Sequence, residues 1–166
     1  ADLPAECAAY ETAISQAGGI ELFLGGVGRN GHIAFNEPGS PLNSRTRPVD
    51  LTPATIQANS RFFLNDIHRV PTRALTVGIA TILQARELLF LASGPTKAQA
   101  LARLAAPGIS SQCPLTALKR HPHATLLADE AACASLQGPL GQQLRHLMQA
   151  EPNAPHWVVE LTEEVL

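Results

Sequence analysis

Cysteine is scarce in this chain, and its spacing is uninformative for metal binding. The 166 residues include three cysteines, Cys7, Cys113 and Cys133, and no pair has the C-x-x-C spacing. An odd number cannot pair completely, and a chain of this length buries roughly 70% of its unfolded surface without covalent help. These observations exclude a disulfide scaffold and a structural zinc ribbon, and they favour a reducing compartment.

Excess positive charge and long apolar runs are also missing. Lysine and arginine number 12 against 14 acidic residues, a formal charge of −2, so no basic field is available to hold a nucleic acid. The longest apolar runs, such as residues 88–92, are far too short to span a bilayer. Residues 1–17 resemble an acidic helix and not a signal peptide. We therefore expect a cytoplasmic protein with neither nucleic acid nor membrane partners.

Short apolar runs alternate with helical patterns along the chain. Runs of strand length without strict alternation, typical of strands covered on both faces in a parallel sheet, lie at residues 20–24, 74–79, 88–92 and 124–128. Helices are predicted at residues 52–63, 96–104, 129–136 and 141–150. This order predicts an α/β, Rossmann-like three-layer fold with a mainly parallel sheet, in one domain over residues 1–166. The tail, residues 151–166, carries turn signals, and its structure is left open.

The most informative segment is the glycine-rich stretch at residues 25–39, directly after the first expected strand. Gly26, Gly28 and Gly31 match G-x-G-x-x-G, the pattern of a dinucleotide-binding turn. That function requires a helix to begin at the glycines, and Pro38 comes too soon to allow one. We interpret the segment as a ligand-binding loop at the carboxyl end of a parallel strand.

This loop contains an imidazole and a carboxylate, His32 and Glu37, five residues apart. Histidine titrates near neutrality and can move a proton in both directions, and a nearby carboxylate can fix its tautomer and raise its basicity. The pair alone leaves a second interpretation open, in which His32 caps a loop and Glu37 is solvated.

The whole string narrows these alternatives. Residues 24–28 (LGGVG) and 31–40 (GHIAFNEPGS) closely resemble the signature of glucosamine-6-phosphate deaminase. The similarity continues at residues 44–47 (SRTR), 58–63 (ANSRFF), 71–78 (PTRALTVG) and 97–101 (KAQAL), and so covers most of the chain. The related 6-phosphogluconolactonases share the Gly-His core but usually lack the Phe-Asn-Glu-Pro continuation that is present here.

The resemblance implies a reaction in amino-sugar catabolism that needs no cofactor and no metal. Members open the ring of glucosamine 6-phosphate, isomerise it through an enediol and release ammonia to give fructose 6-phosphate. His32 matches the histidine that moves the ring-oxygen proton, and Glu37 matches the carboxylate that supports it. Asn30 lies where many members carry an aspartate of the same relay, so we expect a lower His32 pKa than in those members.

The resemblance also assigns two groups of phosphate-binding residues. Arg61 and Lys97 match the family's contacts to the substrate phosphate, a role that suits a guanidinium and a lysine in the first turn of a helix. Ser40 and Arg47 match residues that hold an effector phosphate in regulated members. Val49 is no polar replacement for a further residue of that site, so we do not expect regulation by an acetylated amino-sugar phosphate.

One histidine pair, His121 and His123, has a spacing that could serve a metal. No third ligand lies nearby in the sequence, so we expect no metal site there and interpret the pair as part of the connection before residues 124–128. Association into a homo-oligomer is left open by the sequence.

Two elements of the family lie upstream and have no counterpart in this sequence. They are the aspartate that moves the proton between the first two sugar carbons and a glycine- and serine-containing phosphate loop. We therefore expect a fold that is incomplete at its N-terminus, with unpaired strands, uncovered apolar surface and little or no activity by itself. A non-catalytic sugar-phosphate-binding module of the same fold is the alternative. His32 and Glu37 favour the enzyme, because a sensor needs only the phosphate contacts.

Overall fold

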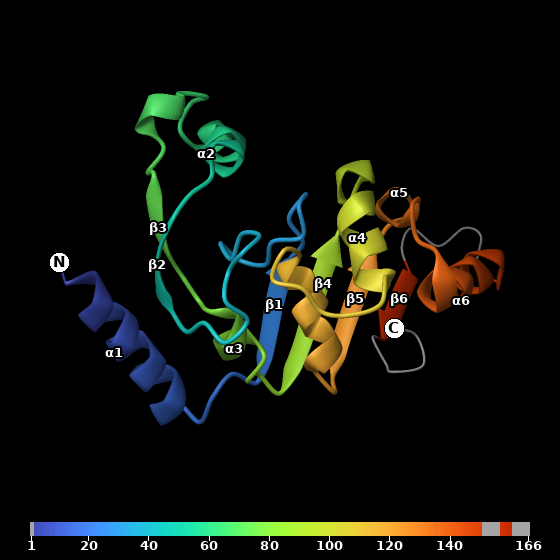
Figure 1. Cartoon of the computed structure of the whole chain (residues 1–166), viewed down its shortest axis with the longest axis horizontal. Coiled ribbons are helices and arrows are strands. Elements are labelled where there is room, and N and C mark those ends of the chain that lie inside the picture. Colours follow the sequence, from blue (N-terminus) through green and yellow to red (C-terminus); the bar gives the residue numbers. More distant parts are fainter. Residues whose placement is uncertain (1, 151–156, 161–166) are drawn as a thin grey trace.

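A computed structural model describes residues 2–150 and 157–160. Its centre is a four-stranded sheet with the order β1-β4-β5-β6 (Figure 1). The strands β1 (Leu22–Gly26), β4 (Glu87–Ala92) and β5 (Ala124–Ala128) run parallel, and β6 (Trp157–Glu160) pairs with β5 in the antiparallel sense. A mainly parallel sheet with helices in its connections confirms the predicted α/β, Rossmann-like fold.

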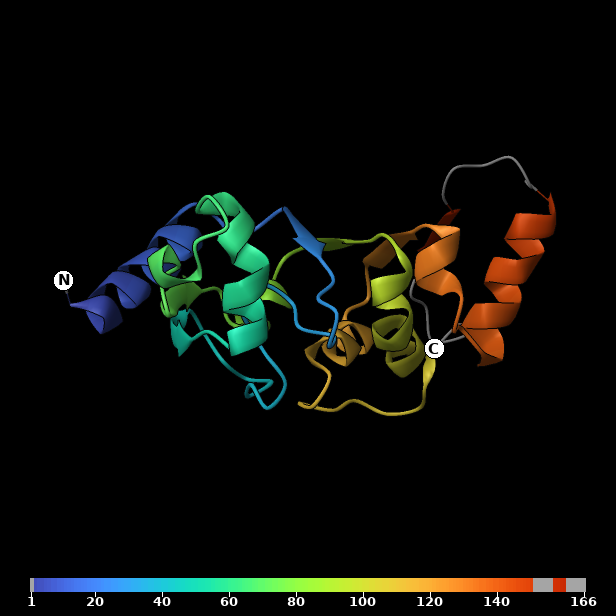
Figure 2. The same cartoon turned by 90° about the horizontal axis from the view of Figure 1, so that it is seen from above.

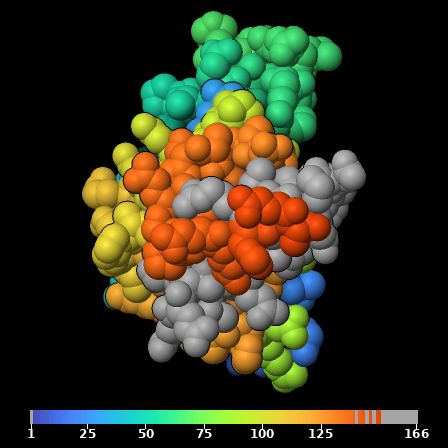
Figure 3. All heavy atoms as spheres, turned by 90° about the vertical axis from the view of Figure 1, so that its right-hand side faces the viewer, coloured from blue at the N-terminus to red at the C-terminus, as the bar shows by residue number. Residues whose placement is uncertain are grey.

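Helices and 3-10 turns occupy the chain before, between and after these strands. They are α1 (Leu3–Gln16), α3 (Ile79–Ile82), η3 (Pro95–Lys97), α4 (Ala98–Ala105), η4 (Pro114–Arg120), α5 (Glu130–Cys133) and α6 (Gly138–Ala150). Seen from the side of α6 (Figure 3), residues 125–150 form much of the described surface. No helix within the described ranges is long and apolar enough to cross a bilayer.

Residues 47–76 form an excursion away from the parallel sheet. It contains β2 (Arg47–Asp50), α2 (Pro53–Asn59), η1 (Ser60–Phe62), η2 (Ile67–Arg69) and β3 (Arg73–Thr76), and the two strands pair antiparallel (Figure 1). The strand predicted at residues 74–79 therefore exists, but its place in the parallel sheet was wrong. A short apolar run does not distinguish the two pairings, and β2 carries no such run to indicate its partner.

Only one face of the sheet is well covered at β1 and β4. Phe90 is fully buried, and Phe23 stacks on it with ring centroids 5.9 Å apart. On the opposite face, Leu22 and Leu24 are 50% and 59% exposed. The expectation that both faces of these strands are covered is therefore wrong within the described residues. Among the described strands β1 pairs only with β4, so its other edge is free.

The N-terminal helix α1 lies with the excursion at one end of the molecule, and α6 lies at the other end (Figure 2). Glu11 fastens α1 there: its Oε1 accepts hydrogen bonds from the Thr46 amide at 2.8 Å, the Thr46 hydroxyl at 2.5 Å and the Thr81 hydroxyl at 2.6 Å. Burial acts to raise the pKa of Glu11, but these hydrogen bonds outweigh it, so the pKa lies below its ordinary value.

The Glu11 contacts make the stability of the fold sensitive to acid. The folded-state pKa is depressed, so their contribution is present above the unfolded pKa and is lost as the pH falls through the folded pKa. Glu11→Gln should lower the free energy of unfolding by about 1 kcal/mol at pH 7, and the difference should shrink below about pH 4.3. Urea unfolding at several pH values measures it. Glu6→Gln, which changes an exposed glutamate of the same helix, is the control, and an equal loss in both variants would contradict the prediction.

Candidate active site

The parallel register of β1 and β4 brings two loops together at the carboxyl end of the sheet. Gly26 lies opposite Leu91, and the pairing continues with a hydrogen bond from the Val27 amide to the Leu91 carbonyl at 3.0 Å. The glycine-rich loop follows β1, and the loop with Lys97 follows β4. No helix begins between β1 and β2, so the structure agrees with the rejection of a dinucleotide-binding turn.

Glycines make room for the histidine of this loop. A Cβ atom at Gly28 would lie 2.4 Å from carbon atoms of the His32 ring, so only glycine lets the ring lie against the backbone. Gly31 has a φ of +84°, and a Cβ there would lie 2.4 Å from Sγ of Cys113. Of the glycines that resembled a dinucleotide motif, Gly28 therefore makes room for the imidazole and Gly31 for Cys113.

The structure brings together the three residues predicted for proton transfer, with Asn30 between the other two. Nδ2 of Asn30 donates to Oε2 of Glu37 at 2.7 Å, and Oδ1 of Asn30 accepts from the His32 amide at 3.2 Å. The same Oδ1 lies 2.8 Å from Nδ1 of His32, whereas Nδ1 is 3.5 Å from Oε2 of Glu37. An amide oxygen can only accept, so the proton of neutral His32 is held on Nδ1 and the lone pair is on Nε2.

Glu37 is half-enclosed and held as a carboxylate. Its Oε1 accepts a hydrogen bond from Thr55 Oγ1 at 2.5 Å, and Thr52 Oγ1 lies 3.4 Å from the same oxygen. Burial acts to raise the pKa of Glu37, but the hydrogen bonds from Thr55 and Asn30 outweigh it, so this pKa lies below its ordinary value. The glutamate is therefore ionised at neutral pH. Neither threonine was predicted as a site residue from the sequence.

His32 is kept neutral at the pH where it would act as a base. Burial is the main cause that lowers its pKa, the charge of Lys97 lowers it further, and the charge of Glu37 opposes both. Its side chain is 27% exposed, and within the described part of the chain no group bonds to Nε2. A neutral imidazole with a free, accessible Nε2 can accept a proton from a ligand and return it.

The Lys97 charge acts on this imidazole, and two arginine charges act on Lys97. Lys97 was expected in the first turn of a helix. It is the last residue of η3 and the N-cap residue of α4, and Arg61 lies in η1. Burial lowers the pKa of Lys97, and repulsion from Arg29 and from Arg61 lowers it further, so both arginine charges act on the Lys97 ammonium. No carboxylate in the described ranges forms an ion pair with any of them. Such a group of unpaired cations fits a phosphate dianion.

Arg29 was missed by the sequence reasoning. It directly precedes Asn30 in the glycine-rich loop, and that position was the only signal available.

The Lys97 loop is held by a residue that follows the neighbouring strand β5. The Asp129 carboxylate accepts from the Gly94 amide at 2.8 Å and from the Ser93 hydroxyl at 2.5 Å.

Arg47, one of the two residues predicted to bind an effector phosphate, contacts the turn before Glu37. Arg47 donates to Oδ1 of the fully buried Asn36 at 2.8 Å, and Asn36 in turn donates to the carbonyls of Ile33 and Val77. Among the described residues, no hydrogen bond joins Arg47 to Ser40. These contacts give Arg47 a role in shaping the turn that presents Glu37.

The histidine pair before β5 is occupied by protein contacts. His121 is buried; its Nε2 lies 2.8 Å from the Ala85 carbonyl, and its Nδ1 accepts from the His123 amide at 3.0 Å. Both ring nitrogens of His121 are thus used, and the pair forms the connection into β5, as the sequence indicated.

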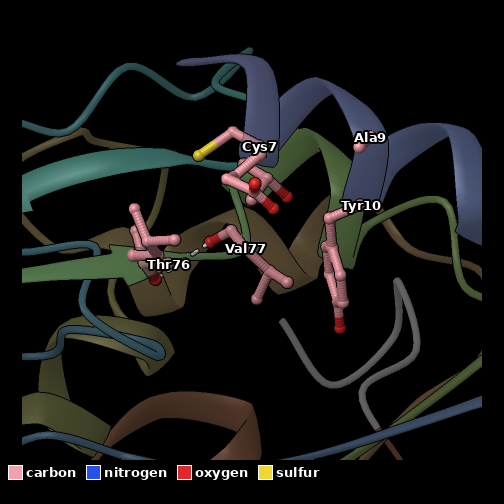
Figure 4. A pocket seen from close by; sticks show the side chains of 8 residues that line it. Cys7, Ala9, Tyr10, Thr76 and Val77 are labelled. Carbon is pink, nitrogen blue, oxygen red and sulfur yellow. Dashed lines mark hydrogen bonds between the residues drawn. The ribbon is translucent and has the colours of Figure 1, made fainter. Parts of the chain in front are cut away.

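A hollow of about 420 Å³ lies elsewhere, between α1 and β3. Figure 4 shows Cys7, Tyr10, Thr76 and Val77 around it. Glu6 is the only charged residue in its lining. It lacks the cations that a phosphate needs, so the loops after β1 and β4 are the better candidate.

The chain is similar to known proteins over most of its length. Residues 1–127 match the family model of glucosamine-6-phosphate isomerases/6-phosphogluconolactonase. A glucosamine-6-phosphate deaminase of Porphyromonas gingivalis is 56% identical over 136 residues, 82% of this chain and 52% of the relative. One of Mycolicibacterium smegmatis is 49% identical over 151 residues, 91% and 57% of the two chains. The chain thus spans about half the length of the curated relatives it matches.

A solved structure shows the same similarity in three dimensions. It is described as a monomeric glucosamine-6-phosphate deaminase and superposes with a TM-score of 0.78 at 46% identity. The match covers 81% of this chain and 55% of the other chain.

The amide at position 30 should keep the pKa of His32 lower than an aspartate would. Asn30→Asp places a second negative charge beside Nδ1, so the pKa of His32 should rise. An NMR titration of the imidazole measures it, with the His32 signal assigned by its loss in His32→Gln. Asn65→Asp adds the same charge in the exposed turn between η1 and η2 and serves as the control. An unchanged His32 titration in Asn30→Asp would contradict the prediction.

Proposed function

Because the chain belongs to the family of glucosamine-6-phosphate isomerases and 6-phosphogluconolactonases, we propose that the protein is an amino-sugar-phosphate deaminase. The reaction converts glucosamine 6-phosphate and water to fructose 6-phosphate and ammonia. One observation carries this proposal: a neutral histidine with a fixed tautomer lies beside a group of unpaired cations. The first can move a proton on a sugar ring, and the second can hold its phosphate.

His32 and the Asn30–Glu37 pair serve ring opening in this proposal. Nε2 of His32 accepts the proton of the anomeric hydroxyl and delivers it to the ring oxygen as the bond between that oxygen and the anomeric carbon breaks. Between these two steps His32 is an imidazolium. Its Nδ1–H donates a hydrogen bond to the Asn30 oxygen, and Nδ1 lies 3.5 Å from Oε2 of Glu37. Both contacts stabilise the protonated imidazole of His32.

Arg61 and Lys97 bind the substrate phosphate, and we add Arg29 to them. A dianion between three positive charges removes their mutual repulsion, which the ligand-free site otherwise bears. The repulsion thus favours phosphate over a neutral sugar.

The Phe-Asn-Glu-Pro turn supports deamination over lactone hydrolysis. Asn36 is buried with both its amide and its carbonyl bonded, and it fixes the turn from which Glu37 reaches Asn30. Because 6-phosphogluconolactonases usually lack the Phe-Asn-Glu-Pro continuation, the presence of this turn favours the deaminase.

The isomerisation base belongs to another part of the protein in this proposal. The exposed leucines of β1, the free edge of that strand and the length of the relatives support a further segment that covers this face. We propose that this segment supplies the base, and that the chain alone has little or no activity. The substrate phosphate is its ligand, in the cytoplasm, where its three buried free cysteines stay reduced. Nucleic acid has no part in this function.

Ammonia release from glucosamine 6-phosphate tests the proposal. The chain alone should be slower than a complete deaminase by at least about 10²–10⁴, the usual cost of a missing general base. A chimera that adds the preceding segment of the Mycolicibacterium smegmatis relative should restore release. His32→Gln should abolish it in the chimera, while His68→Gln, in η2, should not.

Three results would contradict the proposal. They are full activity of the chain alone, a folded chimera that binds the substrate without turnover, and a chimera that hydrolyses 6-phosphogluconolactone without releasing ammonia from glucosamine 6-phosphate. The second result would indicate a non-catalytic binding module, and the third a lactonase.

A further inference from the structure

The Glu37 carboxylate joins two segments that are separate in the fold. Its Oε2 accepts from Asn30 in the loop after β1, and its Oε1 accepts from Thr55 in α2 of the excursion. The Thr55 contact, at 2.5 Å, is the shortest hydrogen bond that this carboxylate makes. Glu37 is thus held at both oxygens, each from a different segment.

The hydroxyl of Thr55 is not used by the cap of its own helix. It lies in the first turn of α2 and is 8% exposed. The helix is capped by Thr52, whose Oγ1 accepts from the Thr55 amide at 3.2 Å, so the cap does not need the Thr55 hydroxyl. The Thr55 hydroxyl instead donates to Glu37.

The Thr55 hydroxyl also receives a hydrogen bond. Thr52 Oγ1 donates to Thr55 Oγ1 at 3.0 Å, and Thr55 Oγ1 donates to Glu37. Hydrogen bonds in such a chain polarise one another and strengthen the last one. The contact between α2 and the carboxylate is therefore directional and fixes where Oε1 lies.

We propose that Thr55 is a positioning residue of the proton-transfer centre, which acts through Glu37 and Asn30 to hold neutral His32 in its Nδ1–H tautomer. With Oε1 fixed, Oε2 faces the NH₂ group of Asn30, and the Asn30 oxygen faces Nδ1 of His32. Without the hydroxyl, the carboxylate is free to turn about its side chain. Asn30 then keeps only the His32 amide to set its orientation.

The same contact sets the phosphate residue relative to the imidazole. α2 continues directly into η1, which carries Arg61 six residues after Thr55. The Thr55–Glu37 hydrogen bond thus connects the base with the helix that leads to one of the proposed phosphate contacts, alongside the Arg47–Asn36 contact. This point rests on the proposed function, whereas the tautomer is a property of the free protein.

The test measures the tautomer of His32 in three variants of the chain. Thr55→Val keeps the shape and removes the hydroxyl, Thr55→Ala removes it with a residue that favours helix, and Thr55→Ser keeps it. Long-range ¹H–¹⁵N NMR at a pH where His32 is neutral reports which ring nitrogen carries the proton. Circular dichroism shows whether each variant is folded.

The wild type and Thr55→Ser should show a predominant Nδ1–H form. In Thr55→Val and Thr55→Ala the ratio of Nδ1–H to Nε2–H should fall at least about threefold, a modest part of what a hydrogen bond to a charged group contributes. An unchanged ratio in either folded variant would overturn the proposal, as would an Nε2–H form in the wild type. The readout needs no turnover, so a chain that proves not to be a deaminase leaves this test intact.

Discussion

The candidate site depends on the hydrogen bond from the Asn30 amide to the Glu37 carboxylate. An ionised carboxylate can only accept, so it takes the NH₂ side of the amide and turns the amide oxygen toward His32. That oxygen also can only accept, and it fixes the imidazole proton on Nδ1. The amide therefore passes on an orientation without adding a charge of its own. His32 stays neutral in a partly buried site and keeps a basic Nε2 toward the ligand side.

The fold brings this network beside the cations. Parallel pairing of β1 and β4 places the two loops at one edge of the sheet, and Asp129 after β5 fastens the second loop through Gly94. Glycine at position 28 lets the imidazole lie on the backbone of the first loop. The ring nitrogen and the phosphate contacts are thus held by three consecutive strands of the sheet, while the antiparallel excursion adds Arg61 and the threonines.

Local pattern predicted the elements whose signal is local. The strand at 124–128 was predicted with its observed bounds because its apolar run is continuous, and α2 begins within one residue of the start predicted at residue 52. β2 was missed because its sequence, Arg-Pro-Val-Asp, has no apolar run, and β3 was assigned to the wrong sheet. The glycine-rich loop revealed His32, Asn30 and Glu37. Thr55 and Arg29 became visible only in the structure, because their contacts join loops that are distant in sequence.

In the proposed function, ring opening and isomerisation use different residues. The residues proposed for ring opening and phosphate contact lie on this chain, and the isomerisation base lies on another segment. Exchange between the α and β anomers of glucosamine 6-phosphate requires ring opening but no isomerisation base. It can be measured by NMR exchange spectroscopy with the purified chain in weak buffer. We predict that the chain accelerates this exchange without releasing ammonia, and that His32→Gln removes the acceleration. An exchange rate equal to that of the His32→Gln variant would contradict it.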